Sequence, residues 1–135
     1  MAGKCLCGAV EYELDPPITS VTHCHCESCR RAHGAAFVTW ATVPRAQLRM
    51  VSGAGRLVAH RSSPGAWRSF CGRCGSQMWM NYDDEPKVTY LALASLTTPA
   101  DRSPDRHVSF EERVPWFPFS DTLPKHVAKS SEIAE

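Results

Sequence analysis

The sequence predicts an all-β fold, made mainly of short strands with one short helix. Apolar residues recur over several runs of four to eight residues, many of them with the alternation of a half-buried strand. Turn-forming residues separate these runs, and ten prolines and eight glycines are spread along the chain. Seven cysteines stand in tight groups, so we expect metal ions to staple the strands together.

The expected elements follow one another closely along the chain. The first strand covers Ala9–Leu14, where every second residue from Val10 onward is apolar. The one helix covers Ser28–His33 and ends at Gly34, because glycine favours the backbone conformation that terminates a helix. Seven later runs have the composition of strands: Ala36–Val43, Leu48–Val51, Arg56–Arg61, Trp67–Phe70, Gln77–Tyr82, Lys87–Leu93 and His107–Glu111.

Length and charge restrict the class of protein. A chain of 135 residues is long enough for one domain, so we expect residues 1–135 to form a single domain. Lysine and arginine (15) nearly balance aspartate and glutamate (14), and the net charge of +1 argues against nucleic acid or a membrane surface as a partner. No apolar run predicts a transmembrane helix or a secretory signal. We therefore expect a cytoplasmic protein.

The cysteines fall into three groups whose spacing is typical of metal ligands. Structural disulfides are rare in a reducing compartment, and an odd number of thiols cannot all pair. Sites made only of thiolates favour zinc. Redox-active pairs and unligated core thiols are the alternatives. The groups are Cys5/Cys7 (C-x-C), Cys24/Cys26/Cys29 (C-x-C-x-x-C) and Cys71/Cys74 (C-x-x-C).

Spacing alone leaves two ways of dividing the seven cysteines. In the first, the central group binds one ion with three sulfurs, and the two outer pairs form a closed four-sulfur site. A closed site is structural, whereas three protein ligands leave a position for water or substrate and mark a catalytic metal. In the second, Cys26 and Cys29 join Cys71 and Cys74 in one site that is similar to a zinc ribbon, and the other three cysteines bind nothing.

The motifs around the cysteines carry a likeness to a known family over residues 3 to 125. The segments that carry it are Gly3-Lys-Cys5-Leu-Cys7-Gly8-Ala-Val10-Glu-Tyr12, His23-Cys24-His25-Cys26-Glu-Ser-Cys29-Arg30-Arg31-Ala-His-Gly34-Ala35, Phe70-Cys71-Gly-Arg-Cys74-Gly75, His107-Val-Ser-Phe-Glu-Glu-Arg-Val-Pro-Trp116 and Leu123-Pro124. They resemble the glutathione-dependent formaldehyde-activating (GFA) family, which also includes centromere protein V.

The resemblance implies a fold, a metal content and an activity. The implied fold is the zinc-stapled β-tent, which the family shares with methionine sulfoxide reductase B. The family's activity joins glutathione and formaldehyde into S-(hydroxymethyl)glutathione. The resemblance implies two zinc ions per chain, the structural one held by Cys5, Cys7, Cys71 and Cys74 and the catalytic one by Cys24, Cys26 and Cys29.

A zinc ion with three thiolate ligands favours a particular chemistry. Such a site is a weak Lewis acid but accepts a fourth sulfur well. Coordination deprotonates a thiol that is mostly protonated at neutral pH. We therefore expect a carbon–sulfur lyase that adds a small thiol, such as glutathione, to an aldehyde such as formaldehyde, or catalyses the reverse. The alternative is a non-catalytic binding module whose two zinc sites are both closed.

The remaining candidates are residues that could contact the substrate. Arg30 and Arg31 follow the central cysteines directly and could bind the carboxylates of an anionic thiol, or be solvated helix charges. Trp116 lies in an irregular Pro-rich segment and is the aromatic residue best placed to line a pocket. Three histidines could be zinc ligands, proton shuttles, donors to the sulfurs or packing residues: His23, His25 and His107.

Overall fold

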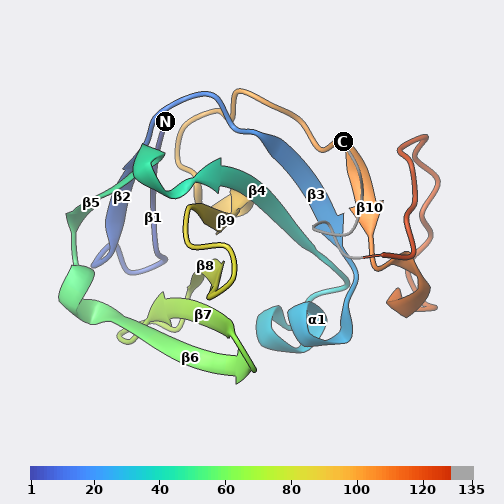
Figure 1. Cartoon of the computed structure of the whole chain (residues 1–135), viewed down its shortest axis with the longest axis horizontal. Coiled ribbons are helices and arrows are strands. Elements are labelled where there is room, and N and C mark those ends of the chain that lie inside the picture. Colours follow the sequence, from blue (N-terminus) through green and yellow to red (C-terminus); the bar gives the residue numbers. More distant parts are fainter. Residues whose placement is uncertain (129–135) are drawn as a thin grey trace.

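The computed structural model describes residues 1–128, which form two β-sheets and one α-helix (Figure 1). The prediction of a mainly β fold with one short helix is confirmed. Within this range no helix is long and apolar enough to cross a membrane. The elements are β1 (Ala2–Lys4), β2 (Glu11–Leu14), β3 (Ser20–Cys24), α1 (Glu27–His33), β4 (Val38–Pro44), β5 (Leu48–Ser52), β6 (Leu57–Ser63), β7 (Ala66–Cys71), β8 (Gln77–Tyr82), β9 (Val88–Ala92) and β10 (Arg106–Val108).

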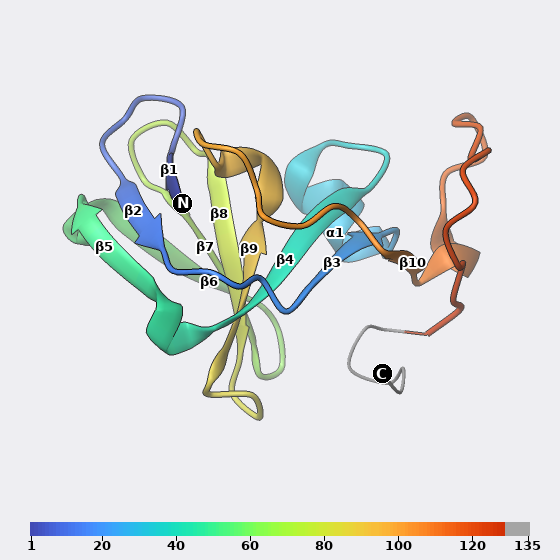
Figure 2. The same cartoon turned by 90° about the horizontal axis from the view of Figure 1, so that it is seen from above.

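The larger sheet has seven strands in the order β10-β3-β4-β9-β8-β7-β6, and the smaller one has three in the order β1-β2-β5. All pairs are antiparallel except β10 with β3, which run parallel. The small sheet lies at one end of the molecule, and the chain that follows β10 stands at the other end (Figures 1 and 2). α1 follows β3, packs against β4 and leads back into it (Figure 1).

Two strands, β1 and β3, were not expected from the sequence pattern, and several expected strands are shorter, among them β2 (Glu11–Leu14 instead of Ala9–Leu14) and β9 (Val88–Ala92 instead of Lys87–Leu93). β3 buries Ser20, Val21 and Thr22 in succession, so both faces of the sheet are covered at this strand and its residues do not alternate in polarity. β1 has only three residues, which are too few to show the alternation of apolar and polar residues that is typical of a strand. The run expected over His107–Glu111 continues only to Val108, since Phe110–Glu112 forms a 3₁₀ turn.

The helix lies where the sequence predicts it, and a cysteine begins it. The Sγ of Cys26 accepts a hydrogen bond from the backbone N–H of Cys29 at 3.3 Å, which caps the first turn. Gly34 ends the helix in the left-handed conformation, with φ of 59°. The same cap holds two of the central cysteines on one turn of backbone.

The core divides into two clusters, and each contains cysteines from one end of the molecule. One contains Cys5 and Cys71, packed with buried residues such as Tyr12, Met78 and Leu91. The other contains Cys29, with Cys24 and Cys26 packed against it, and its other buried members are Val38, Trp40, Ala66, Met80 and Ala92. Apolar packing therefore brings together the sulfurs of each group.

Candidate metal centres and the cavity beside them

The outer cysteine pairs meet in space. Cys5 and Cys7 lie in the loop between β1 and β2, and Cys71 and Cys74 lie where β7 turns into β8. All four sulfurs lie within 4.8 Å of one another, with 3.6 Å from Cys5 to Cys7 and 3.9 Å from Cys7 to Cys71. A tetrahedral zinc site with Zn–S bonds of about 2.3 Å has sulfurs about 3.8 Å apart. The four-cysteine group therefore has the spacing and the donors that zinc prefers.

Hydrogen bonds prepare this group for a cation. The backbone N–H of Val10 donates to Cys5 Sγ at 3.3 Å. The side chain and the backbone N–H of Ser76 stabilise the thiolate of Cys74 and lower the pKa of this thiol to about 5. Thiolate, not thiol, is the form that binds metal.

The central cysteines form a second group. Cys24 ends β3, Cys26 caps α1 and Cys29 lies in its first turn, and their sulfurs lie within 4.8 Å of one another. None of the outer cysteines belongs to this group. The structure therefore divides the cysteines into four and three, and the division that is similar to a zinc ribbon is wrong. Three thiol sulfurs at one point are a donor set that fits zinc.

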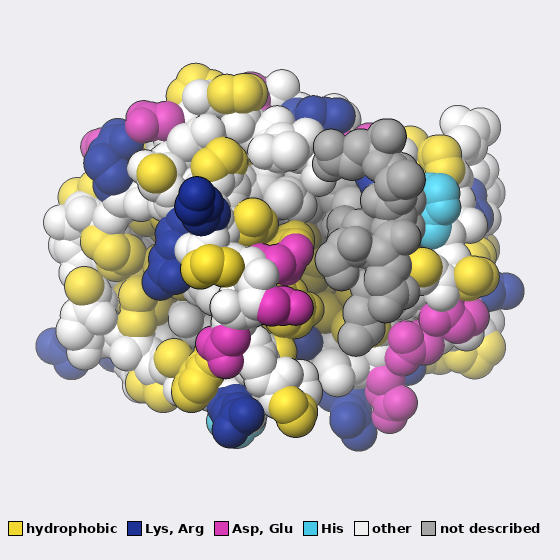
Figure 3. Space-filling view, in the orientation of Figure 1, with side chains coloured by type: hydrophobic (Ala, Val, Ile, Leu, Met, Phe, Trp, Pro, Cys, Tyr) yellow, Lys and Arg dark blue, Asp and Glu magenta, His cyan; other side chains and the backbone are white. Residues whose placement is uncertain are grey.

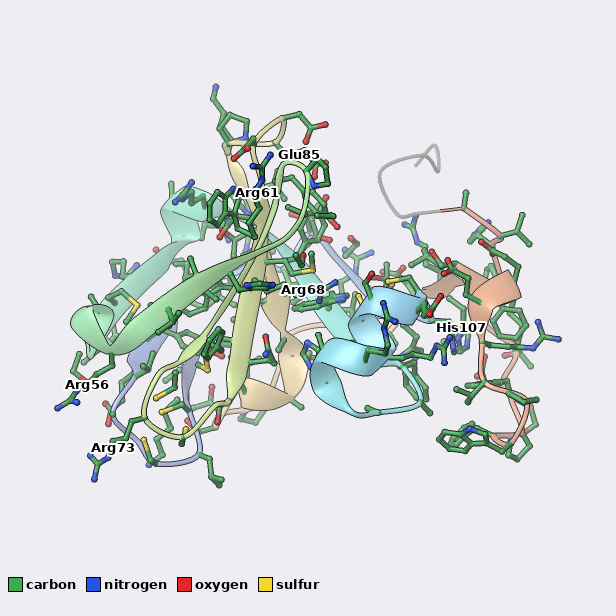
Figure 4. All side chains as sticks on the ribbon, turned by 90° about the horizontal axis from the view of Figure 1, so that it is seen from below. Arg56, Arg61, Arg68, Arg73, Glu85 and His107 are labelled. Atoms are coloured by element: carbon green, nitrogen blue, oxygen red, sulfur yellow. The ribbon has the colours of Figure 1, made fainter. Side chains whose placement is uncertain are left out.

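An arginine that the sequence analysis did not single out touches the three-cysteine group. Arg68 lies on β7 with only 5% of its surface exposed, and its Nη2 donates to Cys29 Sγ at 3.6 Å. Figure 4 shows Arg68 inside the molecule, whereas Arg56 and Arg73 point away from it. Hydrogen bonds from Cys24 and Cys26, assisted by the charge of Arg68, hold the pKa of Cys29 well below its usual range.

The guanidinium of Arg68 is only partly hydrogen-bonded within the part of the chain that the structure describes. Among residues 1–128, neither Nε nor Nη1 has a hydrogen-bond partner, although both atoms are buried. Buried donors are normally paired, because leaving one unpaired costs free energy. Arg68 shares the buried face of β7 with Ala66, and an arginine in a strand is the sequence signal that could have identified it. Both donors suit an oxygen of a bound molecule.

A cavity of about 900 Å³ lies over the three-cysteine group and Arg68. Its buried part is formed by residues such as Cys29, Trp40, Arg68 and Met80. Its more exposed part includes four acidic residues, which we call the acidic rim: Asp83, Asp84, Glu85 and Glu112. The volume lies in the range of small-molecule sites.

The residues expected to contact substrate do not line this cavity. Arg31 is exposed on α1 and pairs with Glu27 at 3.4 Å. Arg30 donates from Nε to the backbone oxygen of His25 at 3.3 Å. Trp116 is 69% exposed and lies in the segment after β10. Arg68 therefore lines the cavity at the central cysteines, and these three residues do not.

The histidines near the cysteines contact one another and the side chains of Thr39 and Asp121. His25 is fully buried, its Nε2 lies 2.7 Å from Nδ1 of His107, and His107 Nε2 lies 2.9 Å from Asp121 Oδ2 (His107 is labelled in Figure 4). His23 Nδ1 lies 2.8 Å from Thr39 Oγ1. Neither His23 nor His25 belongs to the three-cysteine group. Burial lowers the pKa of His25 to about 4, so it is neutral at pH 7.

Comparison with known proteins gives a consistent set of relatives. The sequence profile of a family described as "Glutathione-dependent formaldehyde-activating enzyme" matches residues 1–112. A protein of Halomonas elongata named "Putative glutathione-dependent formaldehyde-activating enzyme" is 27% identical over 124 residues, which cover 86% of this chain and 78% of that protein.

Two further relatives match more weakly or without a function in their description. A protein of Schizosaccharomyces pombe named as an uncharacterized lyase is 28% identical over 80 residues, which cover 59% of this chain and 56% of the relative. A crystal structure of a Rhodobacter sphaeroides protein is 31% identical with a TM-score of 0.62, and the match covers 75% of this chain and 92% of that one.

Proposed function

This chain belongs to the glutathione-dependent formaldehyde-activating family, and on that premise we propose that it adds a small thiol to an aldehyde such as formaldehyde. In this reaction the sulfur–carbon bond forms, the π bond of the carbonyl breaks, and the thiol proton ends on the carbonyl oxygen. The reverse reaction cleaves a carbon–sulfur bond, as a lyase does. The names of the Halomonas and Schizosaccharomyces relatives support this class of reaction.

We assign a zinc ion to each cysteine group, two per chain. The four-cysteine group closes its own coordination shell, so its role is structural. The three-cysteine group leaves one position for a ligand from outside the chain. Zinc bound there supplies a place where a substrate sulfur is held as the thiolate at neutral pH. We expect the whole chain, residues 1–135, to act as one domain around these two sites.

Arg68 is the residue of this chain that we expect to act on the aldehyde. Its Nε and Nη1 face no partner among residues 1–128, and it lines the same cavity as the three cysteines. When a thiolate attacks a carbonyl, negative charge builds up on the oxygen. Fixed N–H donors at that point stabilise the transition state, and burial strengthens their effect. Arg68 therefore binds the carbonyl oxygen and holds it until a proton arrives.

The observation that carries the proposal is the contact between Arg68 and Cys29 at the base of a cavity large enough for substrate. The test is to mix formaldehyde and glutathione with zinc-loaded protein and follow the adduct by proton NMR against the uncatalysed rate. We expect a rate above background that depends on protein concentration. Other thiols are tested in the same way, because glutathione is indicated only by the name of the family.

A second measurement separates the enzyme from the non-catalytic module. Zinc-loaded protein is titrated with each thiol by calorimetry, and bound zinc is counted. Absence of any rate above background with every thiol, at two zinc ions per chain, contradicts the proposed reaction and favours a zinc-stabilised binding module.

A further inference from the structure

His25 lies between Cys24 and Cys26 of the three-cysteine group, and its backbone is held on both sides. Its N–H donates to the backbone oxygen of Val108 on β10 at 3.1 Å. Its backbone oxygen accepts a hydrogen bond from Arg30 Nε at 3.3 Å. The connection from β3 to α1 is therefore fixed at His25 both to β10 and to the helix.

The side chain of His25 begins a chain of polar contacts that leads away from the cysteines. His25 and His107 are 0% and 1% exposed, so both rings are buried. Nε2 of His25 contacts Nδ1 of His107, and Nε2 of His107 contacts the carboxylate of Asp121. The side chain of Asp121 is 40% exposed and lies in the segment after β10 (residues 109–128). Figure 4 shows His107 between α1 and this segment. These contacts connect the outside of the molecule to the backbone between two of the cysteines.

Aromatic rings surround the two imidazoles. The ring centroid of His25 lies 4.7 Å from that of Phe119 and 5.2 Å from that of Phe110, and both phenylalanines stand edge-on to it. The same two rings pack against His107, at 5.8 Å and 5.4 Å. A hydrogen bond in apolar surroundings is stronger than one in water, and its loss leaves a buried polar atom unpaired. The contact between the two histidines is therefore shielded from water by the segment after β10.

The segment after β10 is also tied to His107 through the backbone. The N–H of His107 donates to the oxygen of Pro124 at 2.8 Å, and the oxygen of His107 accepts the N–H of His126 at 3.0 Å. The segment stands at one end of the molecule, where the surface carries hydrophobic, acidic and basic side chains (Figures 1 and 3). Its outer side faces solvent, and the contacts around His107 hold its inner side to the large sheet.

The order of donors along the chain follows from its outer end. A carboxylate accepts hydrogen bonds and cannot donate them, so Nε2 of His107 carries the hydrogen that Asp121 accepts. In the neutral ring Nδ1 of His107 then has only a lone pair, and the hydrogen in the 2.7 Å contact belongs to Nε2 of His25. Nδ1 of His25 carries no hydrogen and has no hydrogen-bond partner among residues 1–128. Asp121 thereby fixes the tautomer and the orientation of both rings.

From this chain of contacts we infer that Asp121 is a positioning residue for the three-cysteine group. Through His107 and His25 it holds the connection from β3 to α1 in the conformation that binds zinc. The inference rests on the zinc ion proposed for this group and not on the addition reaction. Loss of the outer partners of a metal site typically lowers metal affinity by about 10- to 100-fold. Because Asp121 acts through two rings, we expect an effect of about tenfold.

The first measurement is the zinc affinity of each site. Zinc-loaded protein is titrated with a chromogenic chelator, and the ion of the three-cysteine group is identified as the one that Cys26→Ala lacks. We expect Asp121→Ala to bind this ion about tenfold more weakly. Its other zinc ion should be held as in the unaltered protein, which also shows that the variant is folded.

Two further variants separate the hydrogen bond from the charge. Asp121→Asn keeps an oxygen that accepts from Nε2 of His107, so its zinc affinity should stay within about threefold of that of the unaltered protein. Glu111→Ala is the control, because it removes an exposed carboxylate of the same segment that has no hydrogen bond or ion pair among residues 1–128. We expect no change in either zinc affinity in this control.

The second measurement reads the tautomers and does not depend on zinc. Nitrogen-15 NMR of histidine-labelled protein, at about pH 8 where an ordinary histidine is neutral, distinguishes a ring nitrogen that carries a hydrogen from one that does not. In the unaltered protein we expect His25 and His107 each to carry the hydrogen on Nε2. In Asp121→Ala the ring of His107 should lose this fixed pattern, whereas Glu111→Ala should retain it.

The outcomes separate this inference from the proposed reaction. A hydrogen on Nδ1 of His107 in the unaltered protein overturns the inference, as does an unchanged affinity of the three-cysteine group in Asp121→Ala. Equal weakening of both zinc ions in Asp121→Ala also overturns it, because the whole fold is then damaged. If zinc affinity and tautomers change as expected but no thiol adds to formaldehyde faster than background, the inference holds and the proposed reaction fails. An unaltered protein that binds only one zinc ion contradicts both.

Discussion

Arg68 Nη2 lies 3.6 Å from Cys29 Sγ, so a buried cation on β7 touches a sulfur on the first turn of α1. This contact joins the two sides of the cavity. It places a fixed positive charge beside the three-cysteine group, and the same side chain, which lines the cavity, has two further nitrogen atoms, Nε and Nη1, without a hydrogen-bond partner among residues 1–128. The proposed reaction depends on those two groups.

The first prediction concerns the removal of this charge. We expect Arg68→Met to lower the rate of adduct formation about 100-fold or more at saturating thiol, because the donors to the developing negative charge are lost. Arg68→Lys should recover part of the rate, since it restores a charge without the planar donor group. Arg61→Met is the control, because Arg61 is exposed on β6 and lies outside the cavity. An unchanged rate in Arg68→Met at full zinc loading contradicts this role.

The second prediction contrasts the two cysteine groups. Cys5 and Cys71 join loops that are far apart in the sequence, and both are buried in a core cluster. We expect Cys5→Ala and Cys71→Ala to lose the folded state or to melt at least about 10 °C lower, because metal binding contributes directly to folding. Cys26→Ala should retain most of the fold and lose one zinc ion. Circular dichroism melts with zinc assays compare the three variants, and equal damage from all three contradicts the assignment.

The third prediction tests how the loop after β5 packs on the four-cysteine loop. A Cβ on Gly53 would lie 1.9 Å from the backbone oxygen of Ala9, and the φ of Gly53 is +83°. We expect Gly53→Ala to lower the free energy of unfolding by about 2 kcal/mol or more, because backbone must move and the conformation is strained. A Cβ on Gly55 has no atom within 4 Å, so Gly55→Ala should change the free energy of unfolding by less than about 0.5 kcal/mol. Urea unfolding measures both, and equal effects contradict the packing.

The local patterns of the sequence predict the strands and the cysteine clusters, but not the pairing of distant segments. Cys26/Cys29 and Cys71/Cys74 have the same spacing, so the spacing alone permits them to share an ion. The fold keeps them apart, because α1 and the β7–β8 turn belong to different core clusters. The likeness to a family indicated the correct division, and the three-dimensional grouping of the sulfurs confirms it.

Arg30 and Arg31, which are next to the central cysteines in the sequence, do not line the cavity beside them. Successive residues on a helix point about 100° apart, so a buried Cys29 directs Arg30 and Arg31 away from its own face. Arg68 and the acidic rim, which do line the cavity, come from β7, the β8–β9 turn and the segment after β10. No local pattern shows that these three meet, so the sequence could mark Arg68 only as an arginine within a strand and could not place it or the acidic rim at the cavity.

The fourth prediction uses a buried tyrosine of the other core cluster. Tyr12 is 1% exposed, and its hydroxyl lies 2.5 Å from Ser95 Oγ. The hydroxyl of Ser95 donates to the backbone oxygen of Ala92, so Tyr12 is the donor in the first contact. Burial raises the pKa of Tyr12 to about 12, which outweighs the opposite effect of the hydrogen bond to Ser95.

The sign of the pH dependence follows from that shift. The folded state holds the proton more tightly than the unfolded state, whose tyrosine pKa is about 10. The stabilising effect is therefore complete below pH 10 and is lost as the pH rises through 12.

At neutral pH we expect Tyr12→Phe to be about 1 kcal/mol less stable than the unaltered protein, because the variant lacks the hydrogen bond. That difference should vanish near pH 11, where ionisation favours unfolding of the unaltered protein alone by about 1.4 kcal/mol. Urea unfolding of both proteins from pH 8 to pH 11.5 measures this difference in stability. The pKa values of Tyr82 and Tyr90 are also raised, but these two residues affect both proteins equally. A stability difference that stays constant over this range means that Tyr12 is not shielded from water in the folded protein.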